Sequence, residues 1–251
     1  MDRNPDLIRY DIFQDFTTIF AFTTTKSTLP VEQVRYSNVP ENKAKLADAL
    51  ALEVEQMVYP DQTHSSCVAD VQEVPDAVIS ETDALVTNQA GLCLCVQTAD
   101  CVPVLLFDPK AKVIAAVHAG WRGTVSGIVE KAIGKMINNY GASAENIVAA
   151  IGPSISPEIY EVGDEVVAAA RKSIPNVETA LHKNGSGNYH FNLWEANRQL
   201  LLKNGVQAQN IEVLGACSFS EAEKYYSARR EGVGTGRMVS GIMLKGVHLV
   251  K

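Results

Sequence analysis

The chain has 251 residues, of which 46% are hydrophobic, and it carries a formal net charge of −7 with a pI near 5.3. This length and apolar content suffice for a sizeable buried core, and we expect one α/β (α+β) domain spanning residues 1–251. The acidic balance argues against broad binding to nucleic acid or to an anionic membrane, because both need a basic surface.

The sequence of the first half of the chain predicts one helix, with strands before and after it. Residues 10–13 and 18–25 are rich in β-branched and aromatic side chains, which predicts an early antiparallel pair of strands. A helix is predicted from Pro40 to Tyr59, because apolar residues recur there at spacings of three to four. These residues are Leu46, Leu50, Val54 and Met57.

Four further strands are predicted at residues 83–88, 91–96, 102–107 and 113–117. The last two are continuous apolar runs, a pattern typical of strands that are covered on both faces. Cys101 precedes the first of these two runs and His118 follows the second. The sequence thus places a thiol and an imidazole at the two ends of a strand-turn-strand unit.

A helix is predicted from Thr124 to Asn138, with Thr124 as its N-cap and its end near Gly141. Arg122 lies just before this predicted start. Free backbone N–H groups and the helix dipole would add to the charge of Arg122, so we expect an anion pocket here that suits phosphate. Trp121 is interpreted as a packing residue.

The second half predicts a strand at residues 147–151, helices at 165–172 and 193–203, and strands at 211–217 and 238–244. A surface turn is predicted at residues 184–188. Arg229, Arg230 and Arg237 form a basic, glycine-rich patch between the last two strands, and we expect one of the three to do more than face solvent. We find no repeat and no linker that would divide the chain.

The N-terminal residues are polar, and no apolar run approaches the roughly 18 residues that a membrane helix needs. We therefore expect a soluble, cytoplasmic protein. Five cysteines without framework spacing predict free thiols rather than disulfides. Cys93 and Cys95 share one strand face, which favours packing over an accessory soft-metal site.

His64, Cys101 and His118 are the candidate metal ligands. Zinc takes thiolate and imidazole ligands, and a catalytic zinc site uses three of them and leaves one position open. The spacing is long, so a core thiol with two unrelated histidines is an equally good interpretation from chemistry alone. The other three histidines carry no supporting motif and are expected on the surface; they are His182, His190 and His248.

Four blocks of sequence resemble one bacterial family, the laccase-domain family. It was long labelled multicopper polyphenol oxidase and is now described as purine nucleoside phosphorylase, with peptidoglycan editing attached to some members. The blocks are residues 83–88, 98–106, 118–123 and 160–163, and the resemblance runs from Phe22 to Arg237. The chain departs from the usual pattern at Thr25, at residues 158–159 and at Asn192.

The resemblance implies that His64, Cys101 and His118 hold zinc, with Cu²⁺ as the alternative metal. It also implies a layered α/β fold, with mixed β-sheets flanked by helices, related to bacterial toxin deamidases that use a Cys-His pair. Five histidines are too few for a multicopper oxidase, which needs about ten imidazoles. At most a single-copper phenol oxidase remains.

Our hypothesis from the sequence is a zinc-dependent purine nucleoside phosphorylase that releases base and ribose 1-phosphate, with adenosine deamination at the same site. Its partners are a purine nucleoside and phosphate, with neither nucleic acid nor membrane. His64, Cys101 and His118 are the expected catalytic residues. The expected substrate- and phosphate-binding residues are Gln62, Arg122, Arg229 and Arg237.

Two other classes of function stay open at this point. One is a Cys-His hydrolase or amidase acting on a peptidoglycan precursor, with Cys101 as nucleophile and His118 as base. The other is a non-catalytic metal-binding protein that a partner recognises. The sequence makes no prediction of the oligomeric state.

Overall fold

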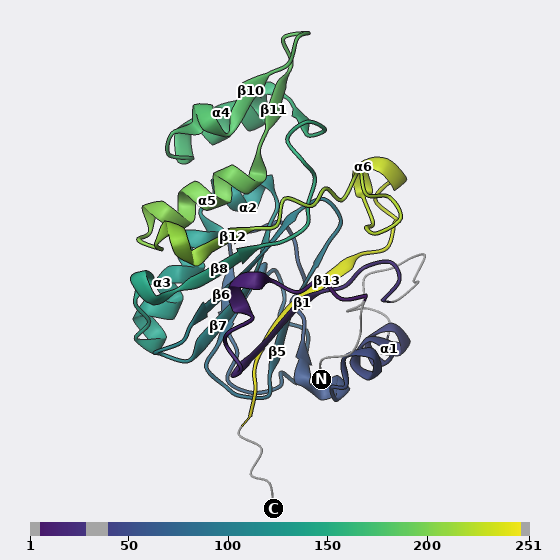
Figure 1. Cartoon of the computed structure of the whole chain (residues 1–251), viewed down its shortest axis with the longest axis vertical. Coiled ribbons are helices and arrows are strands. Elements are labelled where there is room, and N and C mark those ends of the chain that lie inside the picture. Colours follow the sequence, from purple (N-terminus) through teal and green to yellow (C-terminus); the bar gives the residue numbers. More distant parts are fainter. Residues whose placement is uncertain (1–5, 29–39, 247–251) are drawn as a thin grey trace, which may run out of the picture.

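A computed structural model describes residues 6–28 and 40–246 and shows two β-sheets packed face to face, with helices outside them (Figure 1). The larger sheet has six strands in the order β12-β8-β6-β7-β4-β3. They are β3 (Val68–Asp70), β4 (Ala84–Thr87), β6 (Val102–Asp108), β7 (Val113–Ala119), β8 (Val148–Ile151) and β12 (Ile211–Val213). The two outermost pairs are parallel and the inner ones antiparallel.

The smaller sheet has four strands in the order β1-β13-β5-β2. They are β1 (Ile19–Thr23), β2 (Met57–Val58), β5 (Cys93–Thr98) and β13 (Met238–Leu244). Leu94 and Ile242 of this sheet share one buried cluster with Leu105 and Ile114 of the larger sheet. This cluster is the core between the two sheets.

Helices cover the outer faces of both sheets (Figure 1). On the larger sheet, α3 buries Ile128, Ala132 and Met136, one residue from each successive turn. On the smaller sheet, α1 packs Leu46 and Leu50 against strand residues. The helices are α1 (Pro40–Leu50), α2 (Trp121–Val125), α3 (Ile128–Tyr140), α4 (Asp164–Ser173), α5 (Leu193–Lys203) and α6 (Ala228–Glu231).

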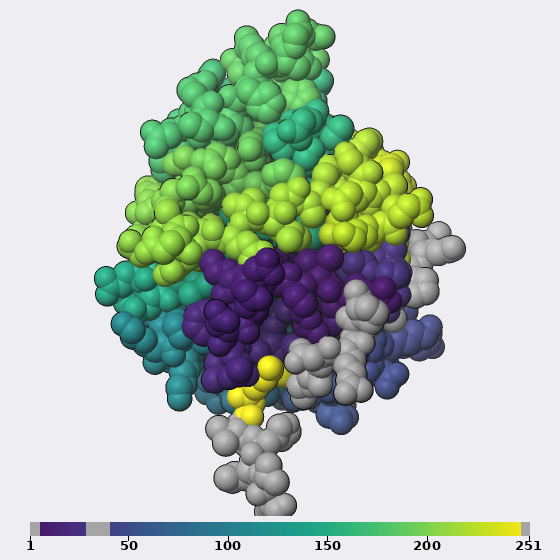
Figure 2. All heavy atoms as spheres, viewed as in Figure 1, coloured from purple at the N-terminus to yellow at the C-terminus, as the bar shows by residue number. Residues whose placement is uncertain are grey.

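A three-stranded sheet of β9 (Glu161–Val162), β10 (Leu181–Lys183) and β11 (Tyr189–Phe191) lies at one end of the molecule (Figure 1). Short 3₁₀ helices occur at Asp11–Phe13, Val54–Gln56, Ala144–Asn146, Val177–Thr179 and Ala208–Asn210. The N-terminal segment lies against the C-terminal part of the chain (Figure 2), where the Ile12 amide donates to Glu212 Oε2 at 2.8 Å. Within the described residues, no helix combines the length and apolar character that crossing a bilayer requires.

The structure confirms the expected α/β (α+β) class and most of the predicted elements. The runs 102–107 and 113–117 form the hairpin β6–β7, and both strands are buried along their length. Helix α5 and strand β13 have the predicted bounds. Residues 184–188 connect the hairpin strands β10 and β11, and these two strands had no counterpart among the predictions.

Two predictions in the first part of the chain are wrong. Residues 10–13 form a 3₁₀ turn, not a strand, since Tyr10 and Phe13 are three residues apart and both point into the core. Strand β1 pairs with β13 instead, and its β-pairing with the described part of the preceding segment is one isolated bridge between Ile8 and Thr23. The helix predicted to reach Tyr59 ends at Leu50.

The early end of α1 has a backbone cause. Ala51 adopts a left-handed φ of 53°, and the Leu52 amide donates to the carbonyl of Ala47 at 2.9 Å. This bond closes the helix as in a Schellman motif. Met57, which was expected on the helix, therefore lies in strand β2.

The start and the N-cap predicted at Thr124 are also wrong, whereas the predicted end of this helix near Gly141 is confirmed. Helix α2 already begins at Trp121, and Gly127, with a φ of 76°, separates it from α3. Thr124 lies inside α2, where its hydroxyl accepts a hydrogen bond from Asn197 Nδ2 at 3.2 Å. Arg122 lies inside the short helix α2, and no helix begins directly after it, so the helix start on which the expected anion pocket depended is not at this position.

Two smaller corrections concern the second half of the chain. The strand predicted at 211–217 ends at Val213, and Gly215 just beyond it turns the backbone with a left-handed φ of 67°. His190 is buried rather than on the surface, and its Nδ1 lies 2.8 Å from the carbonyl oxygen of Pro157. His182 is exposed as expected, and the prediction for His248 lies outside the described residues.

Candidate metal centre and substrate cleft

The antiparallel register of β6 and β7 brings Cys101 and His118 together. Pro103 pairs with His118, and Val102 pairs with Ala119, so the residue before β6 lies beside the end of β7. His64 reaches the same point from the loop before β3, where its φ is 62°. The ligand atoms of His64, Cys101 and His118 all lie within 4.8 Å of one another.

Asp83 fixes the positions of both histidines. Its Oδ1 lies 2.7 Å from Nδ1 of His118 and accepts the backbone N–H of His64 at 3.0 Å. Its Oδ2 accepts the amide and the hydroxyl of Ser65, both at 2.7 Å. This fully buried carboxylate thereby leaves Nε2 of His118 for a metal, as the carboxylate–histidine–zinc arrangement requires.

The charges of the site favour an ionised thiol. Burial opposes ionisation of Cys101, but the charge of His118 and hydrogen bonds from both histidines lower its pKa to about 6. Burial likewise opposes protonation of His118, but Cys101 and Asp83 raise its pKa to about 9. Burial of Asp83 is outweighed by its hydrogen bonds from His118 and Ser65, which lower its pKa to about 2.

The donor set fits a metal ion. One thiolate and two imidazoles are ligands that zinc and copper both accept, and three protein ligands leave a position for substrate. Gly120 permits this close grouping, because a Cβ there would lie 3.0 Å from Cys101 Sγ and 3.1 Å from a ring carbon of His64. A larger residue at this position would press on two of the three ligands.

The three ligands open into a cleft of about 450 Å³. Its wall combines polar and apolar residues from distant parts of the sequence. They are Pro60, Gln62, His64, Gln97, Ala99, Asp100, Cys101, His118, Ile155, Tyr160, Ala228, Arg229, Val233 and Arg237. A mostly preformed concave site with a few placed polar groups is typical of small-molecule binding.

Asp100, the residue before Cys101, forms hydrogen bonds with the opposite wall of the cleft. Its backbone has a φ of 90°, a conformation that costs a non-glycine residue on the order of 1–3 kcal/mol. Its carboxylate accepts the Ser218 hydroxyl and the Arg229 amide, both at 2.7 Å. These bonds hold the start of α6 beside the thiol.

Arg229 and Tyr160 form a pair on the cleft wall. The Arg229 guanidinium lies 5.4 Å from the centre of the Tyr160 ring, and it donates to the carbonyl of Glu161 at 3.4 Å. Burial and the neighbouring charge of Cys101 raise the pKa of Tyr160 to about 12, so its hydroxyl keeps its proton at neutral pH. The pair offers an anion one cation and one hydroxyl donor.

Two of the other expected binding residues line the cleft but are engaged locally. The Gln62 amide makes two bonds of 2.8 Å with the backbone of Gln97, as donor and as acceptor. The Arg237 guanidinium donates to the carbonyls of Val233, Thr235 and Gly236. Both side chains therefore shape the wall of the cleft.

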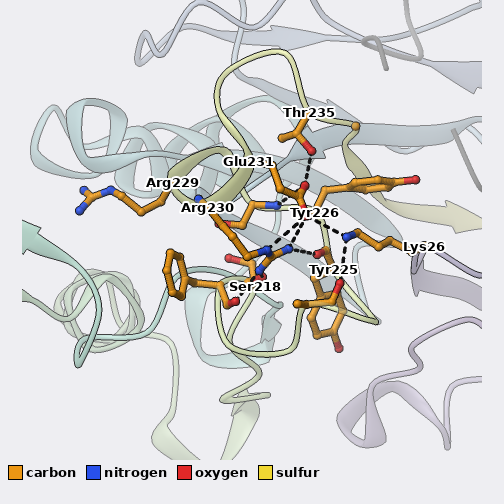
Figure 3. A network of polar contacts seen from close by, with 12 residues as sticks. Lys26, Ser218, Tyr225, Tyr226, Arg229, Arg230, Glu231 and Thr235 are labelled. Atoms are coloured by element: carbon orange, nitrogen blue, oxygen red, sulfur yellow. Dashed lines mark hydrogen bonds and ion pairs between the residues drawn. The ribbon is translucent and has the colours of Figure 1, made fainter. Parts of the chain in front are cut away.

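Arg122 and Arg230 are outside the cleft lining. The Arg122 guanidinium lies 4.3 Å from the centre of the Trp121 ring. Arg230 is part of a structural network in which it donates to the carbonyls of Ser218 and Tyr225 and to the carboxylate of Glu231 (Figure 3). Of the three arginines in the basic patch, Arg229 thus makes the fewest hydrogen bonds from its guanidinium to backbone carbonyls. It also lines the same cleft as the candidate ligands.

Sequence reasoning missed Asp83, Asp100 and Tyr160. Asp83 and Tyr160 each open a block that carries the family resemblance, and Asp100 directly precedes Cys101. Each acts through groups remote in sequence, so only the motif blocks could have pointed to them.

Comparison with known families decides the family. The model described as multi-copper polyphenol oxidoreductase laccase matches residues 32–245. The chain belongs to this laccase family. Within the family, a relative named purine nucleoside phosphorylase from Bacteroides thetaiotaomicron is 36% identical over 264 residues, covering 95% of this chain and 96% of that protein. A relative named adenosine deaminase RL5, from an unknown prokaryotic organism, is 36% identical over 262 residues, covering 96% and 99%.

Two solved structures share the fold of this chain. YlmD from Geobacillus stearothermophilus superposes with a TM-score of 0.88 at 28% identity, over 98% of each chain. YfiH from Bacillus licheniformis, described as a hypothetical protein, gives a TM-score of 0.87 at 31% identity, over 97% of this chain and 98% of its own.

Proposed function

We propose that this member of the laccase family is a zinc-dependent purine nucleoside phosphorylase. The observation that carries the proposal is the grouping of His64, Cys101 and His118 within 4.8 Å in a cleft that also contains Arg229. The relatives named purine nucleoside phosphorylase support it, since they include one that matches nearly the whole chain. The substrates would be adenosine, inosine or a related nucleoside together with phosphate.

Zinc is the proposed metal, and His64, Cys101 and His118 would hold it. The thiolate and the Asp83-oriented imidazole suit zinc, and copper remains the alternative ion for the same donors. When bound, the metal would supply Lewis-acid chemistry in the cleft. The five histidines of the chain rule out a multicopper cluster, whatever the family name suggests.

Arg229 is the proposed phosphate-binding residue. In phosphorolysis, a phosphate oxygen forms a bond to the anomeric carbon, and the carbon–nitrogen bond breaks with its electron pair leaving on the base. The attacking phosphate is an anion, so it needs a cation that holds it in line with the reacting carbon. Arg229 and the hydroxyl of Tyr160 can do this from the cleft wall, whereas Arg237 is engaged with backbone carbonyls.

Adenosine deamination is a second activity that we propose for the same cleft. It is supported by the relative named adenosine deaminase, which covers nearly the same length. In this reaction, water adds to the ring carbon that bears the amine and ammonia leaves. Both reactions use a purine nucleoside, and they differ in whether phosphate or water is the nucleophile.

A Cys-His hydrolase remains the alternative that one observation favours, namely the lowered pKa of Cys101 beside His118. A thiolate that is committed to a metal is a poor nucleophile, so the two assignments predict opposite results for metal-free protein. Alkylation of Cys101 in metal-free protein that is fully active before the treatment, with loss of that activity, would support the hydrolase.

The test is turnover by protein of known metal content. Adenosine and inosine are incubated with and without phosphate, and the products are separated by chromatography. We expect base and ribose 1-phosphate only when phosphate is present, and loss of both zinc and turnover in Cys101→Ala. Cys67→Ala is the matched control, since this exposed thiol is outside the cleft lining. Absence of turnover by zinc-loaded protein, or full turnover by Cys101→Ala, would contradict the proposal.

A further inference from the structure

An exposed valine lies in the wall of the cleft. The segment from Glu231 to Arg237 has the sequence EGVGTGR, in which glycines flank Val233. Val233 is 86% exposed, the highest value among the exposed large hydrophobic residues in the described ranges 6–28 and 40–246. It also lines the cleft that holds the candidate metal ligands. Single exposed apolar side chains are common on protein surfaces, but this one stands in the lining of a cleft, where a bound small molecule would cover it.

Both ends of this segment are fixed by side chains. At its start, Glu231 accepts hydrogen bonds from Lys26 and Arg230, both at 2.8 Å, and from the hydroxyl of Thr235 (Figure 3). At its end, Arg237 donates to the Val233 carbonyl at 2.8 Å. The exposure of Val233 is therefore the result of a held backbone rather than of a free end.

Two glycines, Gly232 and Gly234, flank Val233 at the tip of the segment. Gly232 has a φ of 87° and a ψ of 168°, a conformation open essentially to glycine alone. Gly234 is different, because its φ lies outside the left-handed range, while a Cβ at either glycine would meet no atom within 4 Å. The Thr235 amide donates to the Gly232 carbonyl at 3.2 Å, and this bond closes the turn that presents Val233.

We propose that Val233 packs against the flat face of the purine base in the bound nucleoside. This inference rests on the proposed function. A valine side chain has no hydrogen-bonding group, so it would strip water from a phosphate or a ribose hydroxyl without replacement. The face of a purine ring forms no hydrogen bonds that the same packing would break. In this arrangement the purine base packs against Val233 and the phosphate binds to Arg229.

The test compares Michaelis constants for the two substrates. In Val233→Ser we expect the KM for inosine to rise about five- to tenfold, because serine cannot replace the apolar packing of valine on the base. The KM for phosphate, kcat and zinc content are expected to stay unchanged, and Val233→Ile is expected to restore the KM for inosine. Val78→Ser is the matched control, because Val78 is 58% exposed and lies outside the cleft.

Calorimetric binding of inosine separates this inference from the proposed function. If wild-type protein turns over inosine and Val233→Ser has an unchanged KM for it, or an equal rise in both KM values, the inference is overturned. If wild-type protein binds inosine without turnover and Val233→Ser binds it five- to tenfold more weakly, the inference stands and the phosphorylase assignment falls. Absence of inosine binding by wild-type protein overturns both.

Discussion

Asp83 is the residue on which the geometry of the candidate metal centre depends. One carboxylate oxygen bonds to Nδ1 of His118 and accepts the amide N–H of His64, and the other accepts the amide N–H of Ser65. The carboxylate thus couples a strand residue to a loop residue whose φ of 62° is unfavourable by itself. Without it, His118 could choose either ring nitrogen for the metal, and the loop around His64 would lose its acceptor.

Asp83→Asn is expected to weaken zinc binding by about 10- to 100-fold, the usual effect of removing a partner that orients a metal ligand. The amide is similar in size but would present N–H donors to backbone N–H groups that now donate to an oxygen. Competition with a chromogenic chelator measures the affinity. Asp70→Asn is the control, because Asp70 is a partly exposed partner of Lys135 outside the cleft. Equal zinc affinity of folded Asp83→Asn and wild type would refute the role.

The metal ligands could be proposed from sequence because the family resemblance implied them, whereas chemistry alone left a core thiol with two unrelated histidines equally open. Their meeting could not be derived, since it depends on the register that pairs Pro103 with His118. The helix-assisted anion pocket at Arg122 failed for a related reason. The amphipathic pattern continues from α2 into α3, and it does not show that Gly127 turns left-handed between them.

At the scale of elements, β13 shows how closely the smaller sheet packs. It lies between β1 and β5, and Gly241 pairs with Phe22 on one side and Cys95 on the other. A Cβ on Gly241 would lie 2.6 Å from Cζ of Phe22. The aromatic ring occupies the space that a side chain at this position would need.

Gly241→Ala is therefore expected to destabilise the fold by about 1–3 kcal/mol, the typical result of overpacking a buried core. Gly134→Ala in α3 is the matched comparison, because a Cβ there meets no atom within 4 Å. It is expected to stabilise the helix by about 0.5–1 kcal/mol. Urea unfolding of both variants measures the two free energies. An unchanged free energy of unfolding in Gly241→Ala would show that Phe22 moves aside without cost.

The element boundaries that sequence did not predict lie where tertiary contacts override local pattern. The repeat of apolar residues after Pro40 continues past Leu50, yet Ala51 turns left-handed although it is not a residue that favours this conformation. Helix α5 was predicted with its bounds because Asn204 and Gly205 follow it, and strand β13 because charged residues, Arg237 and Lys245, bound its mostly apolar sequence.

At the scale of the whole molecule, the first and the last strands of the described chain pair with each other. Strand β1 pairs with β13 along its length, and beyond the sheet Lys26 bonds to Glu231 at 2.8 Å (Figure 3). No local pattern could predict these contacts, since Lys26 and Glu231 are separated by 205 positions in the chain. The Lys26 contact also fixes Glu231, the first residue of the segment that carries Val233.

This closure predicts a specific dependence of stability on pH. Burial disfavours ionisation of Glu231, but hydrogen bonds from Lys26, Thr235 and Arg230 lower its pKa from 4.5 to about 2. A lowered pKa means that the folded state binds the proton less tightly than the unfolded state does. The stabilising effect is complete above the unfolded value of 4.5 and is lost as the pH falls toward 2.

Glu231→Gln is expected to lower the free energy of unfolding at pH 7 by on the order of 1–2 kcal/mol, after allowance for solvent screening of this partly exposed group. The difference from wild type should shrink at about pH 3.5, where unfolded Glu231 is largely protonated, and urea unfolding at both pH values measures it. Glu178→Gln is the control, since Glu178 pairs with Arg171 while 71% of its side chain is exposed. It should change the free energy little at either pH. A Glu231→Gln difference that stays constant between the two pH values would mean that the carboxylate charge is not what holds the two ends together.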